Sequence, residues 1–230
     1  MKKFVSGLTA VMVLMIFSTT LMAAEQEAKA PAKMKPALLV IDIQNAYLPS
    51  MSEQDKKSGL EMINYVIALF RDNGFPVIRV YHTDPGEGPK PGTAAFEYPK
   101  SAAIKKEDPQ VIKNYASAFK KTDLNKILQD KGCNTLFLCG LSATGCVLAT
   151  YHGAQDLDYN TFLVKDCLIS PDTALTKAVQ EICRTISYGA LKLLLETARY
   201  SRNAPGFLCL HRIIAAAIQR LDIANCRGLL

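Results

Sequence analysis

The sequence predicts an α/β protein with a single doubly wound, mostly parallel sheet of about six strands and helices on both faces, a Rossmann-like arrangement. Two observations lead to this prediction. Segments with helical periodicity alternate along the chain with short, continuous apolar runs, and such runs are typical of strands buried on both faces of a parallel sheet. The runs lie at residues 37–42, 76–82, 135–140 and 160–166.

The segments between the apolar runs have helical patterns with recognisable ends. After the first run Gly74 is placed to end a helix, and before the third run Thr122 is expected to cap a helix that stops at Gly132. Residues 146–158 and 172–186, which follow the third and fourth runs, are also predicted to be helical. In the helix that ends before Gly74, the apolar face consists of Leu60, Ile63, Ile67 and Phe70.

The N-terminus has the pattern of an export signal. Two lysines precede an apolar run and then small residues, which predicts a secretory signal peptide at residues 1–23, cleaved after Ala23 or Ala24. The alternative is an uncleaved membrane anchor. Residues 24–35 are rich in Ala, Lys and Pro and are expected to form a disordered tether. A periplasmic or secreted location follows from this interpretation.

One folded domain is predicted at residues 36–197, and the composition changes after it. The chain contains 19 Lys and 3 Arg up to Thr197, whereas residues 198–230 contain no Lys and 5 Arg. This atypical tail is nonetheless compatible with a helix at residues 206–226. The tail could dock on the domain, on a partner or on a membrane surface. The alternative is a tail of foreign origin, for example one produced by a reading-frame change near the end of the gene.

The charge balance limits the classes of partner. Residues 24–197 contain 20 Lys plus Arg and 20 Asp plus Glu, so the overall charge of +6 comes from the two ends. Because nucleic-acid binding needs a basic footprint on the folded domain, no nucleic-acid partner is expected. Membrane contact is expected only through an uncleaved signal or the C-terminal tail.

Seven cysteines, all at or after position 133, are an odd number for an exported protein. At least one must be free or paired between chains. Cys139 and Cys167 lie beside apolar runs and are expected to be small buried hydrophobes. A bridge between Cys133 and Cys139 is disfavoured because a strand would hold their α-carbons too far apart.

Polar side chains gather where the predicted strands end. Asp42 ends the first run, His82 ends the second, and Cys146 lies just beyond the third. Sites of doubly wound sheets lie at the carboxyl ends of their strands. The long stretch between residues 83 and 110 is expected to form a wall of the pocket, and Lys113 closes a short β-like run after it.

Three stretches together resemble the signature blocks of the isochorismatase-like cysteine hydrolases, a superfamily that includes nicotinamidases and N-carbamoylsarcosine amidohydrolase. They are "LLVIDIQNAYLP", "VIKNYASAFKKTDL" and "CGLSATGCVLATYHGAQDLDY". All three occur in the expected order and spacing, and the resemblance covers residues 36–197.

The resemblance implies a catalytic triad of Asp42, Lys113 and Cys146. A cysteine at a helix N-terminus beside a lysine is expected to favour the thiolate, and Asp42 can take the thiol proton and later activate water. Family members also have a cis peptide before the nucleophile, which here is the bond from Leu141 to Ser142. The backbone N–H groups of Ser142 and Cys146 then form the expected oxyanion hole.

The resemblance also implies a small pocket and no metal. Metal-binding relatives carry an Asp-x-His pair and further histidines after the second strand, where this chain has His82 alone, so no metal and no cofactor are expected. For Phe119 a purely structural role in the core is left open. The residues expected in the substrate pocket are Asn45, Tyr47, His82, Ser117 and Phe119.

These observations predict an exported, metal-independent cysteine hydrolase that cleaves a small amide or related C–N bond through a Cys146 thioester. Two alternatives remain: an isochorismatase-type vinyl-ether hydrolase, and a non-catalytic binding or assembly module with the same fold. The expected partners are a small-molecule substrate and further copies of the same chain. The substrate itself is not predicted, because its selection depends on the loop between residues 83 and 110.

Overall fold

The computed structural model of the chain describes residues 33–203. The signal peptide predicted at residues 1–23, most of the predicted tether and the helical pattern at residues 206–226 lie outside the described residues. Residues 34–203 belong to one compact unit.

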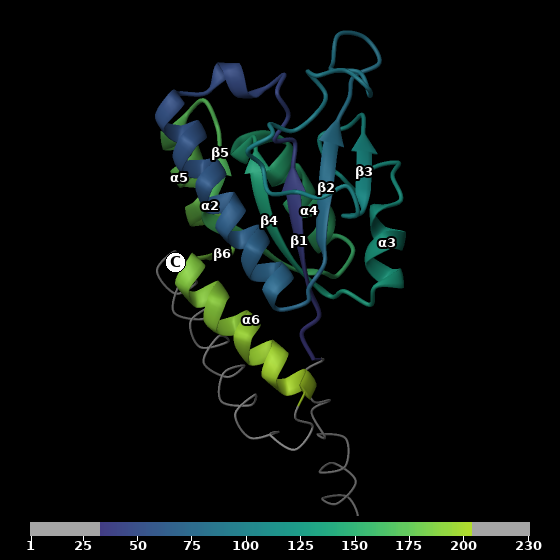
Figure 1. The fold of residues 1–230 in the computed structure, drawn as a ribbon, viewed down its shortest axis with the longest axis vertical. Coiled ribbons are helices and arrows are strands. Elements are labelled where there is room, and N and C mark those ends of the chain that lie inside the picture. The colour runs from purple at the N-terminus through teal and green to yellow at the C-terminus, as the bar shows by residue number, and fades with distance from the viewer. Residues whose placement is uncertain (1–32, 204–230) are drawn as a thin grey trace, which may run out of the picture. The chain divides into compact units, whose positions relative to one another are not determined.

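A six-stranded sheet in the order β3-β2-β1-β4-β5-β6 forms the centre of the domain, and every neighbouring pair is parallel (Figure 1). This topology confirms the doubly wound α/β fold. Strand β1 lies in the middle of the sheet. Strands β2 and β3 follow on one side of it, and β4, β5 and β6 follow on the other side. The strands are β1 (Pro36–Ile41), β2 (Val77–His82), β3 (Gln110–Lys113), β4 (Thr135–Leu141), β5 (Asn160–Ile169) and β6 (Thr185–Ile186).

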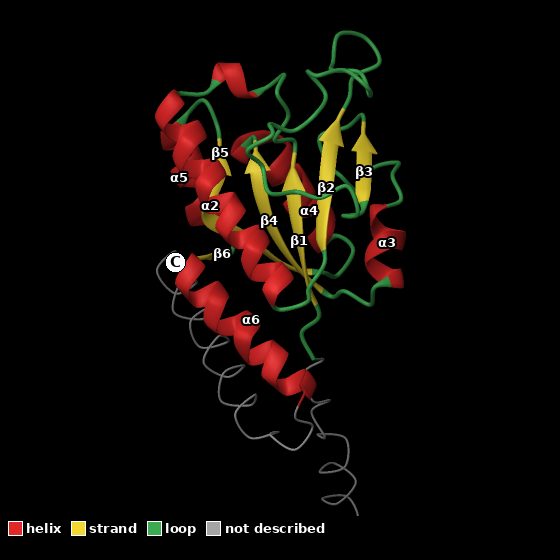
Figure 2. Ribbon diagram, viewed as in Figure 1, coloured by secondary structure: helices red, strands yellow, loops and turns green. Residues whose placement is uncertain are grey.

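Helices cover both faces of the sheet (Figure 2). On one face, α2 and α6 pack over a core cluster that includes Phe70, Phe137 and Leu195. On the other face, α3, α4 and α5 contribute to a second cluster that includes Leu128, Tyr151 and Val179. The helices are α2 (Glu53–Asp72), α3 (Leu124–Asp130), α4 (Leu148–Gln155), α5 (Thr173–Ile182) and α6 (Tyr188–Asn203), with short helical turns η1 (Leu48–Ser50) and η2 (Ala143–Val147).

The first helix, α2, has the face and the ends that its sequence predicts. Ser52 caps its N-terminus by accepting a hydrogen bond from the backbone N–H of Asp55. Gly74 follows its C-terminus with φ of 69°, a left-handed conformation that glycine adopts without steric cost. The predicted apolar face is buried, with Ile63, Ile67 and Phe70 at 0% exposure and Leu60 partly buried against the same cluster.

The helix predicted over residues 172–186 is shorter than expected. It ends at Ile182, and Thr185–Ile186 form the edge strand β6 beside β5. The Thr185 hydroxyl donates to the carbonyl of Gln180, 2.8 Å away, which satisfies one of the carbonyls left without a partner at the helix end. β-branched residues such as Thr185 and Ile186 also favour a strand over a helix.

A further helix, α6, was not predicted from the sequence. It crosses Thr197, where the predicted domain ends, and Ala198 is only 4% exposed against the α2 side of the sheet. In the part of the chain that the structure describes, no helix combines the length and the apolar composition that crossing a membrane requires.

A close approach of β1 and β4 brings the carboxyl ends of these two strands together. Gly140 has φ of 122°, and a Cβ added there would lie 2.1 Å from the carbonyl oxygen of Ile41. No other residue fits, because both the backbone conformation and the space exclude a side chain. The turns that follow Ile41 and Gly140 therefore start side by side.

The five described cysteines are all free, and the bridge between Cys133 and Cys139 is not formed. Cys139 and Cys167 are at 0% exposure. They are packed as small apolar side chains on the α2 side of the sheet.

Candidate active site

Asp42 lies immediately after β1 and is almost completely buried, at 1% exposure. Its backbone is left-handed, with φ of 52°, which aspartate tolerates better than most residues. Its N–H donates to the carbonyl of Val80 on β2, 2.9 Å away. The end of β1 is thus tied to β2, and the Asp42 carboxylate is held inside the protein at the carboxyl edge of the sheet.

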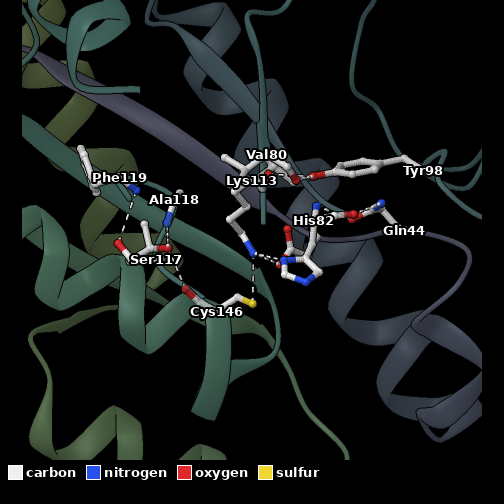
Figure 3. Close-up of polar contacts among 12 residues, drawn as sticks. Gln44, Val80, His82, Tyr98, Lys113, Ser117, Ala118, Phe119 and Cys146 are labelled. Atoms are coloured by element: carbon white, nitrogen blue, oxygen red, sulfur yellow. Dashed lines mark hydrogen bonds and ion pairs between the residues drawn. The ribbon is translucent and has the colours of Figure 1, made fainter. Parts of the chain in front are cut away.

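Lys113 ends β3 and brings its ammonium group into the same space (Figure 3). Its Nζ lies 2.7 Å from Oδ2 of Asp42, and the two side chains are 0% and 2% exposed. The same Nζ lies 3.1 Å from Sγ of Cys146 and 3.0 Å from Nδ1 of His82. An ammonium group has three N–H donors, so these three contacts use all of them.

Cys146 lies in η2, the turn that joins β4 to α4. The peptide bond between Leu141 and Ser142 is cis, as the resemblance implies. The hydroxyl of buried Thr150 donates to the carbonyl of Cys146 at 2.7 Å and accepts the N–H of Ala118 at 3.0 Å. The turn that carries Cys146 is therefore fixed to the segment that follows β3.

Three hydroxyl groups lie in a row beside this turn. Oγ of Ser142 is 3.2 Å from the hydroxyl of Thr144 and 3.2 Å from that of Ser170. Ser170, just beyond the carboxyl end of β5, is 5% exposed. These contacts hold Ser142, one of the residues whose backbone N–H is expected in the oxyanion hole.

The charges of the cluster set the protonation states of the candidate base and nucleophile. Burial raises the pKa of Asp42 above its ordinary value, although Lys113 opposes this effect. Burial and the Asp42 charge raise the pKa of the Cys146 thiol to about 11, although the positive charge of Lys113 lowers it. The expectation that the thiolate is favoured at neutral pH is therefore wrong for the free protein: desolvation and the neighbouring carboxylate outweigh the lysine.

His82 ends β2 beside Lys113 and is held there by Gln44, a residue that the sequence analysis missed. The Gln44 side chain accepts the His82 N–H at 2.7 Å and donates to the His82 carbonyl at 3.0 Å. Gln44 itself is 0% exposed. A glutamine two residues after Asp42, directly after an apolar strand, was the signal for it in the sequence.

Tyr98 is a second residue that the sequence analysis missed. Its hydroxyl lies 2.8 Å from the carbonyl oxygen of Val40 and 2.6 Å from that of Val80. It anchors the long loop after β2 to the strands β1 and β2, close to the end of β1 that Asp42 follows. Tyr98 is the only tyrosine between residues 83 and 110, but no pattern in the sequence indicates that its hydroxyl contacts two strands.

The structure brings only part of the predicted pocket to the cluster. Tyr47 does lie there, with its ring centroid 6.2 Å from that of His82. Asn45 is exposed, and its amide donates to the carbonyl of Ala94 at 2.9 Å, so it fastens the long loop to the first loop.

Ser117 and Phe119 lie on the α4 side of the cluster. A Cβ added at Gly153 of α4 would lie 2.5 Å from Oγ of Ser117 and 3.6 Å from the Phe119 ring. Phe119 also stacks on Tyr159, with ring centroids 5.8 Å apart, and packs against the second core cluster. Neither side chain hydrogen-bonds to a member of the predicted triad.

The isochorismatase domain model matches residues 36–187 of the chain. The chain belongs to the isochorismatase family. It is 32% identical over 138 residues to the uncharacterized isochorismatase family protein YddQ of Bacillus subtilis, covering 58% of this chain and 77% of the relative. It is 28% identical over 153 residues to maleamate amidohydrolase of Pseudomonas putida, covering 58% and 72%.

Solved structures of the isochorismatase family have the same fold. The crystal structure of N-carbamoylsarcosine amidase from Thermoplasma acidophilum matches with a TM-score of 0.60 and 26% identity, covering 67% of this chain and 95% of that one. The resemblance read from the three sequence blocks is thereby confirmed, and so is membership of a family of hydrolases.

Asp42, His82 and Cys146 are also a set of residues that could bind a metal, since one ligand atom from each lies within 4.8 Å of the others. However, Nζ of Lys113 already contacts all three side chains. The positive charge of this buried ammonium group would oppose a dication bound between the same three side chains. These residues therefore fit a lysine-centred site better than a metal centre.

A surface groove lies apart from this cluster, beside β2 and β3 and beneath the long loop. It contains none of the predicted triad. Its lining includes Arg79, Tyr98, Lys105 and Lys106.

Proposed function

We propose that the protein is a metal-independent cysteine hydrolase that cleaves a small amide through a thioester on Cys146. The observation that carries this proposal is the position of Lys113 Nζ, 2.7 Å from the Asp42 carboxylate and 3.1 Å from the Cys146 sulfur. A buried base, a cation and a nucleophile are thus held in one cluster, which is the arrangement that nucleophilic catalysis requires.

The reaction starts from the Cys146 thiol and the Asp42 carboxylate. Oδ2 of Asp42 contacts Lys113, whereas Oδ1 is buried without a hydrogen-bond partner among the described residues. Oδ1 is therefore the oxygen that takes the thiol proton as the sulfur attacks the amide carbonyl. The backbone N–H groups of Ser142 and Cys146 stabilise the oxyanion of the tetrahedral intermediate.

Collapse of this intermediate breaks the C–N bond. Asp42, now protonated, gives its proton to the departing nitrogen, and an amine or ammonia leaves. Asp42 then removes a proton from water, which attacks the thioester carbonyl. The carboxylic acid product departs and Cys146 recovers its proton, so the free enzyme is regenerated. Lys113 compensates the negative charge of Asp42 at the start and of the sulfur in the transition state.

The test is hydrolysis of a panel of small amides by the parent protein and by Cys146→Ala, with mass spectrometry for an acyl group on Cys146. The parent is expected to turn over at least one amide, and the variant none. Equal rates for parent and variant would show that the mechanism is wrong. Turnover of a vinyl ether such as isochorismate, without any amide, would favour the vinyl-ether alternative, and an inert Cys146 would favour the non-catalytic module.

We further propose that the protein is exported and forms homo-oligomers, since an export signal is expected at residues 1–23 and the family resemblance implies assembly. Light scattering of the mature protein measures its oligomeric state. A truncation that tests the C-terminal tail should retain α6 and remove residues 204–230, because Ala198 packs against the core. Unchanged assembly and activity would indicate a tail without a role in either.

A further inference from the structure

Lys113 is the only basic side chain of the catalytic cluster in the described structure, and none of its donors is left for a substrate. Its three N–H groups face Asp42, His82 and Cys146 at 2.7, 3.0 and 3.1 Å. A substrate carboxylate could bind Lys113 only by displacing one of these partners. The Asp42 and Lys113 charges also cancel, so the cluster offers no net positive charge to an anion.

His82 presents a neutral hydrogen-bond donor. Because the ammonium of Lys113 has no lone pair, Nδ1 of His82 must accept, and the proton of the neutral ring is therefore on Nε2. Burial and Lys113 both lower the pKa of His82, which keeps the ring neutral. Within the described residues Nε2 has no hydrogen-bond partner. Gln44 fixes the His82 backbone from both sides, so the donor has a set position.

Tyr47 supplies a second neutral donor beside the first. Its ring is tilted by 57° toward that of His82. Burial, the negative charge of Asp42 and the charge that Cys146 gains in alkaline solution raise the pKa of Tyr47 to about 12, so the hydroxyl keeps its proton. The Tyr47 hydroxyl, like Nε2 of His82, has no hydrogen-bond partner in the described part of the chain.

Asp84 carries a negative charge in the loop that directly follows β2, two residues after His82. It is exposed and forms no ion pair within the described residues. Its negative charge also acts, as the smallest of the causes, to raise the pKa of Tyr47 and to oppose the lowering of the pKa of His82. An anion that comes close to these two donors therefore meets an unfavourable charge.

We propose that this site selects amides whose acyl group is uncharged, binds them through hydrogen bonds from His82 Nε2 and the Tyr47 hydroxyl, and uses Asp84 to disfavour substrates that carry a carboxylate. The proposal rests on the function proposed above and adds the substrate class. Small neutral carboxamides with a hydrogen-bond acceptor fit this space. Monoanionic amide acids and dianions such as isochorismate do not.

Iodoacetamide and iodoacetate test the charge selection without knowledge of the substrate. They are nearly isosteric and differ by one negative charge. The rate of alkylation at Cys146 is followed by mass spectrometry, and each rate is divided by that of a small free thiol. The neutral reagent is expected to be favoured about fivefold or more, and high salt should weaken this preference because Asp84 is exposed to solvent.

Two variants of the same loop form a matched pair. Asp84→Asn should lower the preference for the neutral reagent about threefold. Glu87→Gln, which removes an exposed carboxylate three residues further along, should leave it unchanged. His82→Leu should slow alkylation by the neutral reagent, because the lost Nε2 donor serves its carbonyl oxygen.

The outcomes separate this proposal from the previous one. Equal or faster relative alkylation by iodoacetate would overturn the charge selection and leave amide hydrolysis standing. A neutral preference in a protein that hydrolyses no amide would support the charge selection of the space around Cys146 and overturn the proposed reaction. Among amides that are turned over, a matched pair such as succinamide and succinamate gives the final check, since faster hydrolysis of the carboxylate form would contradict the proposal.

Discussion

Nζ of Lys113 lies 2.7 Å from Oδ2 of Asp42 in a space that solvent does not reach, the two side chains being 0% and 2% exposed. Such a pair is costly to break from one side, because the remaining charge stays buried and unpaired. The catalytic and the structural consequences of this ion pair can therefore be measured separately.

Removing the lysine should damage stability as well as activity. Lys113→Met is expected to abolish turnover and to lower the free energy of unfolding by about 3–5 kcal/mol, measured by urea denaturation. The double variant Asp42→Asn with Lys113→Met removes both charges and should recover part of that stability without any activity. If Lys113→Met were as stable as the parent, the buried ion pair between Asp42 and Lys113 would be contradicted.

The Cys146 thiol should titrate far above neutrality. Its pKa is raised to about 11, so thiolate absorbance in the far ultraviolet, taken as the difference between parent and Cys146→Ser, is expected only in strongly alkaline solution. Asp42→Asn should lower this pKa by removing a nearby negative charge, and Lys113→Met should raise it. A thiolate that forms below the ordinary value of 9.0 would contradict this picture.

Asp42 should affect activity and stability with opposite dependence on pH. Burial raises its pKa above 3.8. As a base it needs its charge, so kcat/KM should rise with pH through the folded-state pKa, with a midpoint above 3.8. The variant His82→Gln should show the same rise of kcat/KM at acid pH. This result would assign the rise to Asp42 and not to His82.

The stability contribution of Asp42 follows from the same shift. Because the folded state holds this proton more tightly than the unfolded chain, the contribution is full below the unfolded-state pKa and is lost as pH rises through the folded-state pKa. The unfolding free energy of the parent minus that of Asp42→Asn should therefore fall across this window. A difference that rises with pH would show that the Asp42 pKa is lowered instead.

Gly140 should tolerate no side chain. Gly140→Ala places a methyl group 2.1 Å from the Ile41 carbonyl oxygen, and we expect a loss of more than about 2 kcal/mol of stability together with reduced activity. Gly92→Ala is the control, since Gly92 also has a positive φ, 85°, but nothing lies within 4 Å of the added carbon. It should cost about 1 kcal/mol and leave activity intact. Similar losses at both positions would contradict a steric cause at Gly140.

The sequence predicted the fold because the fold depends on local patterns. It also singled out Asp42, Lys113 and Cys146, which the structure brings together, and their catalytic roles stay predictions. Apolar runs mark the buried strands, and parallel strands bring Asp42 and His82 to one edge whatever the detailed packing. Gln44 and Tyr98 were missed because their roles come from contacts with carbonyl and amide groups of other strands. The protonation state of Cys146 was also beyond sequence reasoning, since burial, which no motif encodes, outweighs the lysine.

The ends of elements were predicted less well for a similar reason. The helical pattern of residues 172–186 continues past Ile182, and only the hydrogen bond from Thr185 to the Gln180 carbonyl and the pairing with β5 decide that a strand begins. Helix α6 was missed although Leu191 and Leu195 are at 0% exposure.

Four neighbouring segments of the sheet each supply one member of the cluster: Asp42 after β1, His82 on β2, Lys113 on β3 and Cys146 after β4. The weakest of these is β3, a four-residue strand at the edge of the sheet. Fraying of β3 alone would withdraw the ammonium group while the rest of the domain stays folded. Turnover should therefore disappear at lower urea concentrations than helical circular dichroism does, which makes enzymatic activity a local probe of this strand.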